Sequence, residues 1–264
     1  MQLARASWEV LKADKELIAL PVLSLLSTLV VAASFVVPLV WMGRDTGDEP
    51  GWGALALGFV AYLVLAYITI FFNAALVHAA NQRLEGGDPT VGSAVRGAAS
   101  RAGRLFPWAL LSATVSALLR AIEERAGTLG KVISGIAGMA WSLVTFLVIP
   151  ILVMEDLRVG DALRRSTALF KGTWGENVAA RVGFGLLGFL AVLPGVAAIA
   201  GAFALGDPVN PLLLTLGIVW ILAVAMVLSA LSGIFQTALY RFAAGLPSQG
   251  AFASDDLRAA FGAK

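Results

Sequence analysis

Six long apolar segments dominate this sequence of 264 residues. A helix needs about 20 mainly apolar residues to cross a hydrocarbon core of about 30 Å. The segments that meet or approach this length are residues 17–41, 54–80, 105–122, 132–154, 178–205 and 212–240. The third is the weakest, because charged residues follow Leu119 at once, and we expect it to be a shorter or tilted span. The sequence therefore predicts an all-α fold, a polytopic transmembrane helical bundle of about six spans.

The composition excludes several classes of function. Hydrophobic residues make up 59% of the sequence and charged residues only 14%, whereas a water-soluble domain carries roughly a quarter charged residues. The spans leave no room for a soluble catalytic domain. With no cysteine and a single histidine, thiolate and histidine-rich metal chemistry are excluded, and we expect no cofactor and no metal. The formal net charge is only +2 and the basic residues lie between spans, so no nucleic-acid partner is predicted.

The distribution of Lys and Arg predicts the topology, because basic residues in short loops stay on the cytoplasmic side. With six spans, one side of the membrane holds only four of the 19 basic residues, namely Arg44, Arg120, Arg125 and Lys131. The segment before the first span mixes basic and acidic residues, so we expect no signal-peptide cleavage. The prediction is a multi-pass protein of the cell inner (plasma) membrane, with both termini cytoplasmic. Tryptophans near the span ends, among them Trp108 and Trp141, are interpreted as interfacial anchors.

The sequence contains internal similarity. Residues 5–12 (RASWEVLK) align without a gap with residues 164–171 (RRSTALFK), and residues 72–76 (FNAAL) resemble residues 235–239 (FQTAL). We predict a single transmembrane domain, residues 1–243, built of three units of roughly 1–86, 87–158 and 159–243. Each unit is a cytoplasmic amphipathic helix followed by a transmembrane hairpin, and residues 244–264 form a tail. The second amphipathic helix is expected to start at Asp88-Pro89-Thr90, and the third to run from Asp161 to Gly172.

One of these segments carries a family resemblance. GDALRRSTALFKGTWGEN, residues 160–177, precedes an apolar hairpin. It is similar to the ALRRSW..LKG..W segment of several uncharacterised bacterial membrane families, including the membrane domain attached to some glycerophosphodiester phosphodiesterases. Over its whole length the chain most resembles an uncharacterised six-span bacterial family, a domain of unknown function. The resemblance implies this architecture and no activity, since we expect no soluble phosphodiesterase domain in the chain.

Few strongly polar residues lie inside the spans, and each is a candidate site because polar groups are costly in hydrocarbon. Asn73 and Gln236 occupy equivalent positions in the second and sixth spans. Either they hold helices together through hydrogen bonds, or they line a ligand cavity between the first and third hairpins. His78 is interpreted as a wetted residue near the helix end or as a proton sensor. Pro194 interrupts the fifth span and is either a simple bend or part of a binding site.

Two acidic residues, Glu155 and Asp156, end the fourth span. Carboxylates at the carboxyl end of a helix oppose its dipole, so they need basic neighbours. The nearest in sequence are Arg158, Arg164 and Arg165. We interpret Glu155, Asp156 and Arg158 as a structural ion pair, and predict no catalytic residue in the chain.

The function predicted is that of a non-enzymatic integral membrane protein, a scaffold or accessory subunit. Its partners would be anionic lipid headgroups, a membrane or cytoplasmic protein, or a second copy in a homo-oligomer. The residues predicted to make these contacts are Arg5, Lys12, Arg96, Arg101, Arg104, Arg164, Arg165 and Lys171. The alternative is a transporter or lipid-handling protein with a cavity between the hairpins, near Asn73, His78, Pro194 and Gln236.

Overall fold

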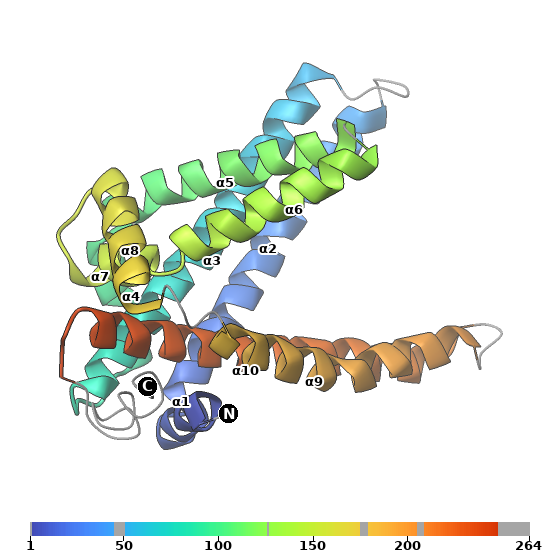
Figure 1. The fold of residues 1–264 in the computed structure, drawn as a ribbon. Helices are drawn as coiled ribbons and strands as arrows, with labels where there is room; N and C mark the ends of the chain where they lie inside the picture. The colour runs from blue at the N-terminus through green and yellow to red at the C-terminus, as the bar shows by residue number, and fades with distance from the viewer. Residues whose placement is uncertain (1, 45–50, 126, 175–178, 205–208, 248–264) are drawn as a thin grey trace.

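The computed structural model describes residues 2–44, 51–125, 127–174, 179–204 and 209–247, and these fold into helices only. Three helices are short: α1 (Gln2–Ala13), α4 (Val91–Ser100) and α8 (Val159–Trp174). The remaining helices are α2 (Glu16–Arg44), α3 (Trp52–Leu84), α5 (Ala102–Arg125), α6 (Gly127–Val144), α7 (Val148–Met154), α9 (Ala179–Ala204) and α10 (Pro211–Ala243). Figure 1 shows three antiparallel hairpins, α2–α3, α5–α6 and α9–α10, whose tips point away from α1, α4 and α8. We call the end that carries these short helices the basic end.

The predicted membrane bundle is confirmed. Five segments of the described chain are long and apolar enough to cross a membrane: α2, α3, α5, residues 130–154 and α10. Within α9, Gly188–Ala204 is a shorter apolar helix, and residues 178 and 205, the expected ends of this span, lie outside the described residues. The third span is a continuous helix of 24 residues. The charged residues after Leu119 lie on its last turns and do not end the helix.

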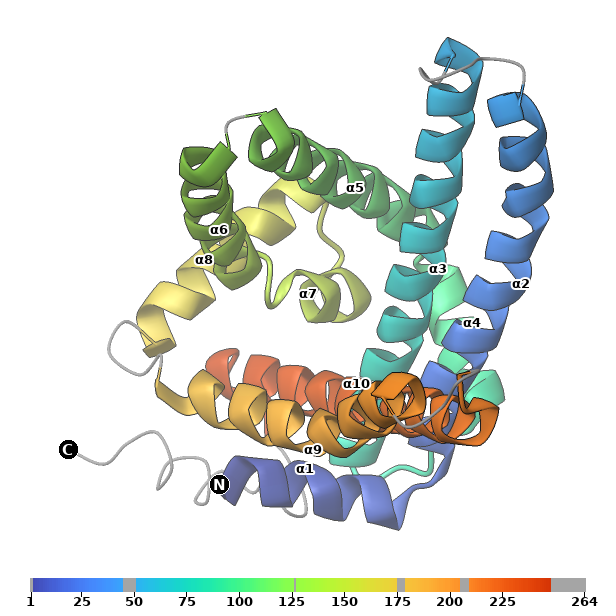
Figure 2. The same cartoon turned by 90° about the vertical axis from the view of Figure 1, so that its right-hand side faces the viewer.

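The fourth span is not the single helix that its hydropathy predicts. It consists of α6 and α7, separated by residues 145–147, which we call the helix break. Pro150 is the physical cause, since proline has no N–H to donate to the carbonyl group four residues earlier, that of Phe146. The chain therefore turns at Phe146, and α7 runs in a new direction (Figure 2).

The short helices pack in a cyclic order. Each contacts the helix that ends the preceding hairpin: α4 lies on α3, α8 lies on α6 and α7, and α1 contacts α10, so the first unit closes on the last. Glu16 at the start of α2 also accepts a hydrogen bond from the N–H of Val91, the first residue of α4, at 2.8 Å. These contacts join the three units at the basic end, although the unit boundaries themselves stay a prediction.

The hydrophobic core lies near this end and not between the hairpin tips. In α7 all six residues 148–153 are buried, and α7 contacts α3, α5, α8 and α10. Residues 74–77 of α3 and 233–241 of α10 are buried around it. Toward the tips, large apolar side chains are exposed, such as Val37 (73%) and Leu212 (67%). Such a surface suits a hydrocarbon environment, because exposing aliphatic side chains to lipid chains has no free-energy cost.

Local signals account for the helix starts at the basic end. Thr90 caps α4. Its hydroxyl accepts from the N–H of Ser93 at 3.1 Å, and the Ser93 hydroxyl accepts from the N–H of Thr90 at 3.0 Å, which confirms the predicted start. The expected bounds of the third short helix were wrong by two residues at each end. The helix begins at Val159, and Gly172 does not stop it because Trp174 is still helical.

Trp108 is not an interfacial anchor. The rings of Trp108 and Trp141 stack with their centroids 5.9 Å apart, between α5 and α6, and Trp108 is only 4% exposed. The interpretation as an anchor was wrong for Trp108, because its ring is buried within the hairpin, whereas Trp141 is only partly buried. Trp52, at 89% exposure near the α2–α3 tip, has the position expected of an anchor.

The α9–α10 hairpin is held by a close approach of two glycines. A Cβ atom on Gly217 would lie 2.8 Å from the carbonyl oxygen of Gly195 and 3.0 Å from the backbone nitrogen of Ile199. Because these atoms belong to the backbone, they cannot move aside as a flexible side chain can. The two helices can approach this closely only with glycine at residue 217.

Replacing Gly217 with alanine is therefore expected to push α9 and α10 apart. The free energy of unfolding should fall by about 1–3 kcal/mol, the usual cost of overpacking, measured by thermal unfolding in detergent. Gly58→Ala is the matched control, since nothing lies within 4 Å of its Cβ position in α3. That variant should be neutral or slightly more stable, because alanine favours helix. Equal stability of the two variants would contradict the close-packing account.

Candidate functional site

The helix break is closed by two side chains from other helices. Gln236 of α10 donates through its Nε2 atom to the carbonyl oxygen of Phe146, the group to which Pro150 cannot donate. The hydroxyl of Ser166 in α8 donates to the carbonyl oxygen of Val144 at 2.6 Å and accepts from the N–H of Leu147 at 3.3 Å. Buried backbone groups must be paired at membrane depth. Gln236 and Ser166 thus provide the hydrogen bonds that a continuous helix would have made within itself.

Beside the break, a cluster of ion pairs covers the carboxyl end of α7. Glu155 accepts from the Tyr240 hydroxyl at 2.8 Å and from the Arg165 Nε atom at 3.2 Å. Asp156 pairs with Arg101, at 2.9 Å, and with Arg104. Both acids oppose the dipole of α7, and the arginines offset that charge.

The hydrogen bond from Arg104, with its charge and that of Arg101, holds the pKa of Asp156 below its ordinary value. Asp156 therefore stays ionised down to a lower pH than a free aspartate. Its contribution to stability is complete above the ordinary aspartate pKa and is lost only as the pH falls through the lowered value. Across the physiological range the ion pair is unaffected by pH.

These partners correct the predicted ion pair. Asp156 pairs with arginines of the second unit and not with Arg158, which is exposed, because the turn after α7 directs the carboxylate toward the start of α5. Arg165 pairs with Glu155 as its position suggested, whereas Arg164 points outward and lies 3.9 Å from Asp161. Arg101 and Arg104 were predicted to contact lipid or a partner, and their side chains are instead about two-thirds buried within the protein.

A buried arginine fixes the end of α10. Arg241 is 3% exposed, and it donates to Glu85 at 2.8 Å, to Asn81 and to the carbonyl oxygen of Pro247. A buried guanidinium needs such partners, because an unpaired charge would be strongly destabilising. Arg241 thereby fastens the residues that follow α10 to the end of α3.

Asp14, in the turn between α1 and α2, is 6% exposed. Its carboxylate accepts from the Glu16 N–H at 3.1 Å, and its second oxygen has no hydrogen-bond partner among the described residues. Burial raises the pKa of this group. The carboxylate caps α2 and fixes the corner at which α1 turns into the first span.

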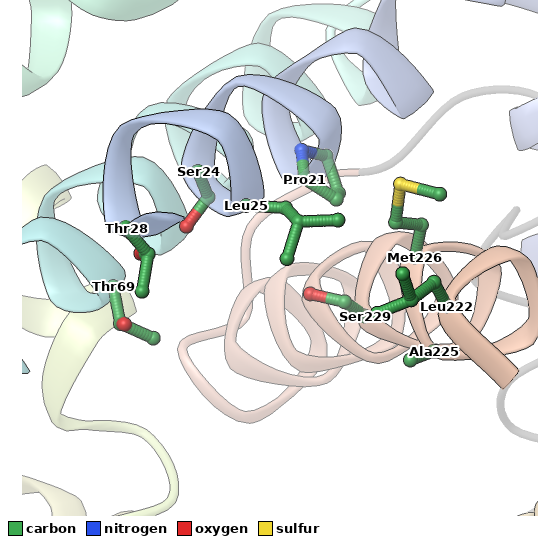
Figure 3. Close-up of a pocket in the computed structure, with 9 residues that line it drawn as sticks. All are labelled: Pro21, Ser24, Leu25, Thr28, Thr69, Leu222, Ala225, Met226 and Ser229. Carbon is green, nitrogen blue, oxygen red and sulfur yellow. The ribbon is translucent and has the colours of Figure 1, made fainter. Parts of the chain in front are cut away.

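A separate groove of about 260 Å³ lies between the first and third hairpins (Figure 3). Three helices line it, and four of the lining residues carry hydroxyl groups. The residues are Pro21, Ser24, Leu25 and Thr28 of α2, Thr69 of α3, and Leu222, Ala225, Met226 and Ser229 of α10. In Figure 3, Leu25 on one side and Met226 and Ser229 on the other point toward the space between α2 and α10. A groove therefore lies between these hairpins, and a ligand cavity there stays a prediction.

None of the residues predicted for that cavity lines it. Gln236 is bound at the helix break, and Asn73 lies on α3 with its side-chain oxygen buried and without a partner among the described residues. His78 is partly buried beneath α4, where a Cβ atom on Gly97 would come within 2.5 Å of its ring. Pro194 is exposed on α9, which stays continuous through it. Ser24 and Thr28 lie one turn apart, but nothing in the sequence connected them with Thr69 and Ser229.

The described residues offer little to a metal ion, since no three His, Asp or Glu side chains among them are grouped to hold one. The basic side chains form a surface instead. Exposed at the basic end are Lys12, Lys15, Arg96, Arg158, Arg164, Arg165 and Lys171. Lys12 lies over the ring of Trp8, with Nζ 5.6 Å from the ring centroid. The side chain of Arg5 lies outside the described residues.

Comparison with known proteins places the chain in a family. A model described as a family of unknown function (DUF6159) matches residues 53–250, most of the chain. The chain belongs to the DUF6159 family. No curated protein and no solved structure matches this DUF6159 protein. The matched residues include the helix break, Gln236 and the ion-pair cluster, whereas α1 and α2 precede them. The expected similarity to the membrane domain of phosphodiesterases stays a prediction.

Ser166→Ala is expected to leave both the Val144 carbonyl and the Leu147 N–H unpaired at the helix break. This should lower the free energy of unfolding of the DUF6159 protein by about 1–3 kcal/mol, measured by reversible unfolding in mixed detergent. The matched control is Ser142→Ala in α6, whose exposed hydroxyl bonds only to its own helix, at the Met139 carbonyl. The control should change stability by less than about 0.5 kcal/mol. Similar losses in both variants would show that Ser166 has no special role.

Proposed function

We propose that this DUF6159 protein is a non-enzymatic integral membrane protein that scaffolds the membrane surface by binding anionic lipid headgroups. The observation that carries the proposal is the shared position of α1, α4 and α8, whose exposed basic side chains all lie at one end of the hairpins (Figure 1). Basic residues near an anionic surface each contribute roughly 1 kcal/mol of attraction.

The balance of charge at the basic end supports this proposal. Most acidic residues there already have a basic partner: Glu85 pairs with Arg241, Glu155 with Arg165, Asp156 with Arg101 and Arg104, and Asp161 with Arg164. The remaining basic side chains, such as Lys15, Arg96 and Lys171, are exposed. The surface charge that remains unpaired is therefore positive. It favours contact with phosphate-bearing headgroups, and not with acidic side chains inside the protein.

The proposal is tested by native mass spectrometry of lipid retention from nanodiscs containing phosphatidylglycerol and phosphatidylcholine. The protein is expected to retain phosphatidylglycerol preferentially. Neutralising the basic end with Lys12→Gln, Arg96→Gln, Arg158→Gln and Lys171→Gln should reduce that preference by up to about five-fold for each residue removed. Added salt should weaken it too.

A control with the same kind of substitution exists at the hairpin tips. Arg120→Gln, Arg125→Gln and Lys131→Gln alter three exposed basic residues there. This variant should keep the preference for phosphatidylglycerol. An equal loss in both variants, or no preference in the unmodified protein, would reject headgroup binding at the basic end. A stoichiometric protein retained from native membranes would instead favour the accessory-subunit role.

The same proposal places the basic end in the cytoplasm, in keeping with the distribution of Lys and Arg. The chain has no cysteine, so single cysteines report position without background. Arg96→Cys and Arg165→Cys should resist a membrane-impermeant maleimide in intact cells, whereas Arg125→Cys at the α5–α6 tip should react. Reaction at residues 96 or 165 with protection at 125 would invert the topology.

A second candidate function, transport or lipid handling, is favoured by the groove between α2, α3 and α10. Its predicted residues Asn73 and Gln236 do not line this groove. A transport role therefore depends on the hydroxyl residues and not on the two amides.

A further inference from the structure

The groove combines an apolar wall with hydroxyl groups at membrane depth. Ser24 and Thr28 lie two and three turns from the charged start of α2 at Glu16. This corresponds to about 12–18 Å along the helix, and less along the membrane normal if the hairpin is tilted. The whole of α2 is longer than the hydrocarbon core, and counted from its other end at Arg44 the same residues lie 20 and 16 positions away, about 24–30 Å. With the α2–α3 tip at one boundary of the core, the groove lies near the opposite boundary, where lipid ester linkages and the first acyl methylenes are found.

The hydroxyl groups of the groove differ in whether they form hydrogen bonds within the protein. Thr69 donates to the carbonyl oxygen of Leu65 in its own helix, at 3.0 Å. For Ser24, Thr28 and Ser229, no hydrogen bond is formed within the described residues. A hydroxyl without a partner in hydrocarbon costs about 1–3 kcal/mol. Three hydroxyl donors from two helices that line one groove are therefore available to acceptors in that groove.

We infer that the groove binds an ester-linked membrane lipid, whose carbonyl oxygens accept hydrogen bonds from Ser24, Thr28 and Ser229. The remaining wall suits the acyl chain, since Leu25, Leu222 and Met226 provide apolar contacts. A volume of about 260 Å³ is too small for a whole phospholipid and fits the ester region with the first methylenes of one chain. No charged residue lines the groove, so it recognises the linkage and not the headgroup.

This site uses none of the basic residues in the proposed headgroup contact, so either proposal can fail alone. Two probes separate them: a diester phosphatidylglycerol and its diether analogue, which share headgroup and chains but differ in the carbonyl groups. Native mass spectrometry of the full-length protein should show the diester retained about five-fold or more over the diether, as expected for lost hydrogen bonds.

Ser24→Ala combined with Thr28→Val and Ser229→Ala removes the donors with little change of shape. This variant should retain both lipids equally, at the level of the diether. Ala225→Phe, which fills the groove, should reduce binding of both, whereas Ala223→Phe, an exposed residue of the same helix outside the lining, should not. The melting temperature of each variant verifies that it is folded.

Equal retention of diester and diether by the unmodified protein would overturn the inference, and would indicate a groove occupied by water. A preference that survives in the triple variant would overturn it as well. If the ester preference holds but the preference for phosphatidylglycerol over phosphatidylcholine is absent, the headgroup proposal fails and the groove stands. The reverse result rejects the groove alone.

Discussion

Pro150 cannot donate a hydrogen bond to the carbonyl group of Phe146, four residues earlier, because proline has no N–H. Gln236 supplies the missing hydrogen bond from α10, and Ser166 of α8 pairs the neighbouring backbone groups. These contacts let α7 leave the line of α6 and lie among α3, α5, α8 and α10. The burial of α7 depends on the break, and most of the hydrophobic core is arranged around α7.

The charged residues around α7 belong to the same arrangement. Asp156 joins the start of α5 to the carboxyl end of α7, Glu155 joins α7 to α8 and α10, and Arg241 joins α10 to α3. The contacts of Glu155 and Arg241 cross between hairpins, whereas those of Asp156 lie within the second unit. Pairing these acids internally leaves the outer basic side chains without partners in the protein. The surface available to anionic lipid is thus a consequence of how the interior charges are matched.

The sequence predicted what depends on local properties. Hydropathy identified the spans because the length and apolarity of a helix are set by its own residues, and Thr90 marked a helix start because capping acts within four residues. The helix break was not predicted although its cause, Pro150, is local, because a proline within a span is often only a bend. The partner that closes the break, Gln236, lies 90 residues from Phe146. Arg158 was the nearest base to Asp156 in sequence, but Arg101, 55 residues away, is the nearer in space. Ser24, Thr28 and Ser229 gave no signal, because isolated hydroxyl residues are ordinary in membrane helices.

The core near the basic end has a mechanical consequence. The three hairpins are joined at their bases, and their tips expose apolar side chains such as Val37 and Leu212 to the solvent around them. Little internal packing fixes the angle between one hairpin and the next toward the tips. Bilayer thickness therefore governs that angle, since each hairpin can tilt to match its hydrophobic length.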